Sequence, residues 1–205
     1  MGLTTKQGGN LVFLKVKDGS ILIKDDANEY KDVQGYLAEV RYRTDTFEGN
    51  DIETMNITLL SDDGTKYVFP TRVGSKMWAT VAGGLVLCDT SKQVRINVGG
   101  EKFDKDGTSK IRSFAWVTQN GAIVKSKYSK DNAQAIGLPE WKKVVVGKKT
   151  IWDFEAWEQF IKADIKVMCD NLTTPTIQAQ PVSAPNPIAV EEKFSTPADD
   201  SDLPF

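Results

Sequence analysis

The chain has 205 residues, with 26 Lys and Arg against 28 Asp and Glu, and it contains no histidine. The absence of histidine excludes Ser-His-Asp and Cys-His catalytic sites, histidine-ligated zinc and histidine pH switches. Cys88 and Cys169 lie too far apart in sequence to form a metal-binding spacing, so we expect them to fill apolar positions in a reducing compartment. No apolar run approaches the roughly 18 residues of a membrane span, and no signal peptide opens the chain. These features predict a soluble, cytoplasmic protein with no membrane partner.

The first half of the chain alternates apolar and polar residues, which is typical of antiparallel strands. Asp18-Gly19 separates two apolar runs, so residues 11–24 are expected to form an N-terminal hairpin. The alternation continues in three further segments, the last of which is expected to end at Pro70: 33–47, 52–60 and 66–69.

The second half mixes helices with strands. A short helix is expected over residues 73–82, stopped by Gly83-Gly84. A longer helix is expected to begin at Thr150, because Thr150 and Asp153 form a capping-box pattern. An apolar stripe predicts the packed face of this helix: Phe154, Trp157, Ile161, Ile165 and Met168. Three strands are expected between the two helices: 92–98, 110–118 and 122–128.

The order of these elements favours one fold class. Three strands, a short helix and at least two more strands form the element order of an OB-fold, a five-stranded barrel. The predicted class is therefore mainly β: an OB-fold-like antiparallel barrel with an added N-terminal hairpin and a C-terminal helix. Other barrels of short strands fit the same pattern and remain alternatives.

Residues 172–205 differ in composition from the rest of the chain. They hold six of the eight prolines, no glycine or tryptophan, and five acidic residues against one lysine. Such a segment buries too little apolar surface to offset its ordering entropy, so we predict a folded domain at 1–171 and a disordered linker and acidic tail at 172–205. The 25 bases and 23 acids of the remaining chain make the body mildly basic, as suits a binder of polyanions.

The tail ends in an acidic cluster followed by an apolar tip: Asp199, Asp200, Asp202, Leu203, Pro204 and Phe205. This tip resembles the C-terminal tip of bacterial and phage single-stranded DNA-binding proteins, in which acidic residues precede a terminal Ile-Pro-Phe. Leu203 takes the place of the isoleucine and keeps the apolar volume. The resemblance covers the tail alone, and the body differs from the bacterial version, which favours a phage-type relative in a host bacterial cytoplasm. It implies non-sequence-specific binding and protection of single-stranded DNA in replication or recombination, with the tail recruiting replication and recombination proteins.

Single-stranded DNA binding requires two features, namely cations for the phosphates and flat side chains on which bases stack. Residues 110–118 carry both at period two, with Arg112, Phe114 and Trp116 on one face. The opposite face, expected to be the core face, carries Ile111, Ser113, Ala115 and Val117. Further cations are predicted to contact DNA from this and neighbouring strands: Arg41, Arg43, Arg95, Lys110, Lys125 and Lys127. The alternative is that Phe114 and Trp116 pack under the C-terminal helix and that the cations only keep strand faces soluble.

No catalytic or metal-binding motif is complete, so the sequence predicts a protein that is not an enzyme and has no cofactor or metal. Two rival functions remain: a β-barrel adaptor that acts through its tail without binding DNA, and a metal-dependent nuclease. The tail is also long enough to fold back on the basic body and compete with DNA. A homo-oligomer is compatible with each of these functions.

Overall fold

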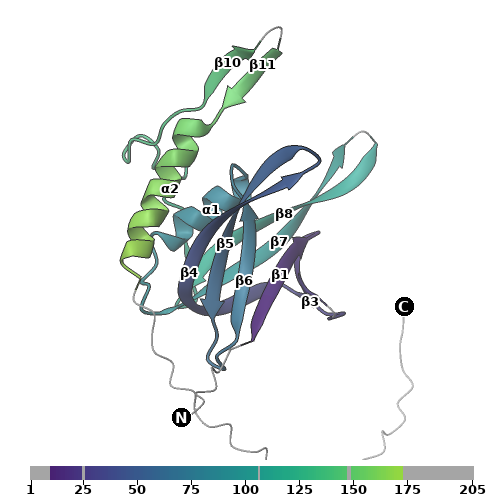
Figure 1. Cartoon of the computed structure of the whole chain (residues 1–205), viewed down its shortest axis with the longest axis vertical. Helices are drawn as coiled ribbons and strands as arrows, with labels where there is room; N and C mark the ends of the chain where they lie inside the picture. Colours follow the sequence, from purple (N-terminus) through teal and green to yellow (C-terminus); the bar gives the residue numbers. More distant parts are fainter. Residues whose placement is uncertain (1–9, 25, 106, 147–148, 173–205) are drawn as a thin grey trace, which may run out of the picture.

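The computed structural model describes residues 10–24, 26–105, 107–146 and 149–172. Within them the chain is mainly β, with one mixed sheet of nine strands, a separate two-stranded hairpin and two helices (Figure 1). The predicted disordered tail and its acidic tip lie outside the described residues. No helix in the described part is long and apolar enough to cross a membrane.

The N-terminal hairpin forms as predicted. Strands β1 (Leu11–Lys17) and β2 (Ser20–Ile23) pair antiparallel around a turn in which Asp18 and Gly19 have φ values of 49° and 76°. Both values lie in the left-handed region, which suits an Asp-Gly turn and matches the twist of the flanking strands. The short strand β3 (Glu29–Tyr30) extends this end of the sheet.

A three-stranded meander follows, made of β4 (Asp32–Phe47), β5 (Asn50–Leu60) and β6 (Lys66–Arg72). The register between β4 and β5 shifts between Leu37 and Glu39, so β4 carries a bulge. One edge of β4 pairs with β7 (Gln93–Lys105) over residues 32–36, and the other edge forms a long hairpin with β5 that continues beyond the bulge. A bulge bends a strand locally, and β4 curves along its length (Figure 1).

The prediction that Pro70 ends its strand is wrong, because β6 continues to Arg72 and Pro70 is paired with Asn56. On its other side β6 pairs with β1 only from Lys66 to Val68. Pro70 therefore lies on a stretch of strand that is an edge on one side, where its missing N–H is tolerated.

Helix α1 (Lys76–Leu85) begins at Ser75, whose side chain accepts a hydrogen bond from the backbone N–H of Trp78 at 3.1 Å. The prediction that Gly83-Gly84 stops this helix is wrong, because both glycines are helical and buried. A Cβ on Gly84 would come within 2.8 Å of Val117 Cβ, and one on Gly83 within 2.0 Å of Ser126 Oγ. These glycines allow α1 to pack closely on β8 and on the segment after β9.

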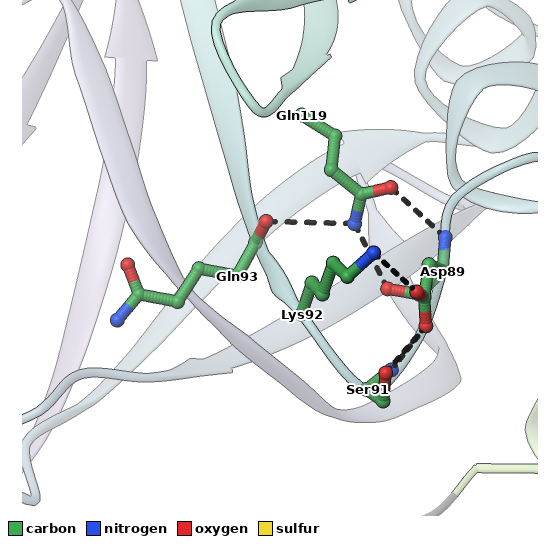
Figure 2. A network of polar contacts seen from close by, with 5 residues as sticks. All are labelled: Asp89, Ser91, Lys92, Gln93 and Gln119. Atoms are coloured by element: carbon green, nitrogen blue, oxygen red, sulfur yellow. Dashed lines mark hydrogen bonds and ion pairs between the residues drawn. The ribbon is translucent and has the colours of Figure 1, made fainter.

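Strands β7 (Gln93–Lys105), β8 (Thr108–Gln119) and β9 (Ala122–Val124) complete the sheet. The loop before β7 is fixed to the end of β8 by a polar network (Figure 2). The Gln119 side chain accepts a hydrogen bond from the Asp89 N–H at 2.9 Å and donates one to the Asp89 carbonyl at 2.8 Å. The Asp89 carboxylate in turn accepts a hydrogen bond from Ser91 and pairs with Lys92 at 3.0 Å.

The C-terminal helix is present, but it starts later than predicted. Residues Lys142–Val146 and Lys149–Asp153 form a hairpin, β10 and β11, and α2 spans Glu155–Asp170. Thr150 therefore lies in a strand and caps no helix, since the N-cap position belongs to Phe154, which makes no side-chain capping bond. The predicted packed face is confirmed for the four residues that α2 buries: Trp157, Ile161, Ile165 and Met168.

The sheet is not closed into a barrel. Its strand order is β3-β2-β1-β6-β5-β4-β7-β8-β9, with β3 and β9 at the two edges. The predicted antiparallel pairing is confirmed among β4, β5, β6, β7 and β8, but the added N-terminal hairpin makes the sheet mixed, because β1 and β6 run parallel. Four strands separate β1 from β6 in the chain, so no connecting turn determines their relative direction. The core lies between the sheet and the helices, and its largest fully buried side chains include Trp78, Phe69, Leu37 and Met55.

Candidate nucleic-acid interface

Two aromatic side chains on β8 form an exposed stacked pair. The ring centroids of Phe114 and Trp116 are 5.6 Å apart and the ring planes are inclined by 25°. Phe114 is 44% exposed and Trp116 is half-buried. The opposite residue on β7 is Gly99, where a Cβ would come within 2.6 Å of Phe114 Cζ. Glycine at this position therefore allows the Phe114 ring to lie close against β7.

Arg112 continues the same face of β8. Its guanidinium carbon lies 4.8 Å from the centroid of the Phe103 ring on β7. A cation above an aromatic face is stabilised by the ring's quadrupole, and the planar guanidinium keeps its donors free to bind an anion. The outer face of β7 and β8 thus carries four flat groups, which we call the β8 platform: Phe103, Arg112, Phe114 and Trp116.

A groove of about 760 Å³ runs beside the platform. Its walls come from α1 (Lys76, Met77 and Thr80), from β8, from Ile123 on β9, and from Gly100 and Glu101 on β7. The groove is possible because β9 pairs only with Val117 to Gln119. In the described chain, the stretch of β8 from Arg112 to Trp116 therefore has no strand partner on that side.

This geometry disagrees with the alternative in which Phe114 and Trp116 pack under the C-terminal helix. The helix that borders their groove is α1, and no α2 residue lines it. The predicted core face of β8 is confirmed for Ala115 and Val117, which are buried. It is wrong for Ile111, which is 39% exposed, because β7 and β8 extend there beyond the body of the sheet.

Among the predicted cations, Lys110 is exposed on β8, directly opposite Phe103 and next to the platform. Lys125 is exposed just after β9. Arg95 lies on β7 with its guanidinium donating to the Gln34 side chain at 2.6 and 2.9 Å. These three cations lie on β7, on β8 or just after β9, so they belong to the same end of the sheet as the platform.

Arg41 and Arg43 lie elsewhere. Both are exposed on β4 beyond its bulge, outside the stretch that pairs with β7, and their partners are Glu39 and Asp45 on the same strand. The structure does not bring them next to Phe114 and Trp116.

Lys127 has a structural partner. The strand expected at 122–128 ends at Val124, so Lys127 lies in the following loop, and its ammonium is 2.8 Å from Asp164 on α2. Tyr128 donates a hydrogen bond to the same carboxylate at 2.8 Å. Burial, and then this hydrogen bond, raise the pKa of Tyr128 above its ordinary value. The cluster joins the loop to α2.

Three groups near Phe114 and Trp116 were not predicted from the sequence: Phe103, Gly99 and Lys76. Phe103 lies four residues after Gly99 on β7, so period-two alternation places both on the same face and could have predicted the position of Phe103. The role of Gly99 appears only when β7 is paired with β8. Among the described residues, no cluster of three potential metal ligands occurs.

No known protein family, curated protein or solved structure matches this chain.

Proposed function

We propose that this chain is a non-enzymatic protein that binds and protects single-stranded DNA without sequence preference. The observation that carries the proposal is the stacked pair of exposed Phe114 and half-buried Trp116 beside Arg112, on a stretch of β8 whose outer edge has no strand partner in the described chain. Aromatic faces accept any base, with about 1–3 kcal/mol of stacking free energy per base, and Arg112, Lys110 and Lys76 supply positive charge for the phosphates.

The proposal includes an open relative of the OB-fold. The meander β4-β5-β6, the helix α1 and the hairpin β7-β8 follow the OB element order, and β4 pairs with both β5 and β7. OB-folds bind oligonucleotides through the loops that join their first two and last two strands. The corresponding turns here end the β4–β5 and β7–β8 hairpins, and Phe47 at the first of them is 61% exposed. The strand that would close the barrel is replaced at β6 by the N-terminal hairpin.

The acidic tail completes the proposal. Residues 199–205 would recruit replication or recombination proteins in a phage-infected bacterial cytoplasm, by placing Leu203 and Phe205 in an apolar pocket and Asp199 near cations. Deleting these seven residues should abolish capture of such proteins while leaving the platform intact. If the tail also competes with DNA, the deletion should tighten DNA binding, most strongly at low salt.

The test is binding of a fluorescent dT oligomer measured against salt. We expect wild-type affinity to fall with a slope of about −0.7 per phosphate contact, and Trp116→Ala to weaken binding roughly tenfold. Phe13→Ala, which removes a 64% exposed aromatic ring from β1, is the matched control and should bind as wild type. Absence of wild-type binding at low salt would instead favour an adaptor that acts through its tail, and cleavage of the oligomer with magnesium would favour a nuclease.

A further inference from the structure

The hairpin β10–β11 projects from the body beyond the N-terminal end of α2 (Figure 1). Five residue pairs hold its strands together, and in the described chain no other strand pairs with either edge. Opposite residues share a face, so Lys143 and Trp152 lie side by side, with Val145 next along that face. Trp152 is 51% exposed and Val145 is 73% exposed. An isolated two-stranded hairpin is only marginally stable in water, and neighbouring exposed apolar side chains mark interaction sites, so this face is a candidate for binding a partner.

The charge of the hairpin restricts the kind of partner. Residues 142–153 contain four lysines and one acidic residue, Asp153, which lies opposite Lys142. A second copy pairing through the same hairpin would bring these lysines together, which is unfavourable. A polyanion has the complementary charge. The Lys143 ammonium lies 4.9 Å from the centroid of the Trp152 ring, so one face presents a cation and an aromatic plane together.

The base of the hairpin is fixed to the core. Trp141 contacts Phe154 and Trp157 edge-to-face, at centroid distances of 5.2 and 5.9 Å. Trp157 in turn contacts the fully buried Trp78 at 5.5 Å. This continuous row of rings joins the base of the hairpin to the core.

We propose that the β10–β11 hairpin is a second contact for single-stranded DNA, separate from the β8 platform. Trp152 stacks on a base, and Lys143 on the same face binds the adjacent phosphate. Lys142, at the end of the strand on the opposite face, binds the next phosphate. The inference rests on the proposed function and extends it, because a strand bound at the platform would continue to the hairpin once it is long enough. Each contact then adds to the length of DNA covered by one molecule.

The experiment compares wild type with Trp152→Ala and with the double variant Lys142→Gln/Lys143→Gln in the full chain. Single OB-folds cover about 4–16 nucleotides, so dT oligomers of roughly 8 and roughly 30 nucleotides separate platform binding from binding to both sites. Lys130→Gln/Lys166→Gln removes the same charge from exposed positions outside the hairpin and is the matched control. Thermal unfolding should be the same for all four proteins.

We expect the hairpin variants to bind the short oligomer as wild type and the long oligomer roughly tenfold more weakly. The salt slope of the double lysine variant should be smaller by about 1.4 on the long oligomer, which corresponds to two lost phosphate contacts. The control variant should keep the wild-type slope.

Other outcomes would overturn the inference. If the hairpin variants bind the long oligomer with the affinity and salt slope of wild type, the hairpin does not contact DNA. Equal weakening on both oligomers would show that the substitutions disturb the platform. A third result is that the variants lose binding to a labelled peptide of residues 199–205 while keeping DNA affinity, which would make the hairpin a site for acidic peptides. If wild type binds neither oligomer, the proposed function fails and the inference fails with it.

Discussion

Two aromatic pairs in this molecule have nearly the same separation and opposite surroundings. Trp78 and Trp157 meet edge-to-face at 5.5 Å, and their exposed fractions are 0% and 7%. Phe114 and Trp116 stack at 5.6 Å beside an open groove, and Phe114 is 44% exposed. The buried pair has already exchanged water for protein contacts, so it stabilises the fold. In the second pair each ring has one side against the other ring, while the parts that border the groove remain open, so free energy can still be gained there on binding.

The largest effect is expected for Trp78→Ala. The substitution removes a fully buried indole between α1 and α2 and leaves a cavity, which should lower the free energy of unfolding by about 3–5 kcal/mol. Urea denaturation followed by circular dichroism measures the change. A loss below about 1 kcal/mol would mean that the helices repack around the cavity. The Trp78–Trp157 pair would then not be a main source of the stability of the fold.

The matching change in the exposed pair is Gly99→Ala, which keeps both rings but displaces one of them. The new Cβ would meet Phe114 Cζ at 2.6 Å, so the exposed ring must move away from residue 99, which changes its stacking on Trp116. We expect affinity for a dT oligomer to fall roughly tenfold, as when one stacked base is lost, with a change in unfolding free energy of about 1 kcal/mol or less. Oligomer titration and urea denaturation on the same preparation give both values. Unaltered affinity would contradict a role for the stacked geometry.

A smaller effect separates two lysines that the sequence did not distinguish. Lys127→Ala breaks the half-buried ion pair with Asp164 and should lower the free energy of unfolding by about 1 kcal/mol, without changing DNA affinity. Lys110→Ala should do the reverse, reducing the salt slope of DNA binding by about 0.7 with unchanged stability. If both variants lose DNA affinity equally, the loop after β9 also contacts DNA.

The smallest effect concerns acid stability. Hydrogen bonds from Ser91 and Lys92 lower the pKa of Asp89 to about 2, below its ordinary value in the unfolded chain (Figure 2). The unfolded state therefore binds this proton first as the pH falls. The stabilisation is complete above pH 4 or so and is lost as the pH falls through about 2. Asp89→Asn should flatten this part of the stability profile, measured by urea denaturation across that range. A profile as steep as that of wild type would assign the acid sensitivity to other carboxylates.

Local patterns predicted the parts of the fold that depend on neighbouring residues. Asp18-Gly19 specifies a left-handed turn by itself, and the β8 alternation placed Phe114 and Trp116 on one face. The same kind of pattern failed where two structures compete for one segment. Thr150 and Asp153 fit a helix start, but cross-strand pairing with Lys142 to Val146 makes residues 149–153 a strand. The residues of the segment alone carry no information about the pairing strand, and it is this pairing that decides between helix and strand.

By itself, the sequence determined that the body is mainly β, that a helix with a stripe at Trp157, Ile161 and Ile165 closes it, and that aromatic and cationic residues alternate on β8. Only the tertiary structure decided which aromatic side chains remain exposed at the surface and which are buried in the core. Trp78 and Trp116 both lie among apolar and cationic neighbours in sequence, but Trp78 packs against Trp157 of α2 in the core, whereas Trp116 lies on a stretch of β8 whose outer edge has no strand partner in the described chain. The reason is physical: burial depends on surfaces that come from distant parts of the chain, whereas alternation depends only on the direction of successive side chains.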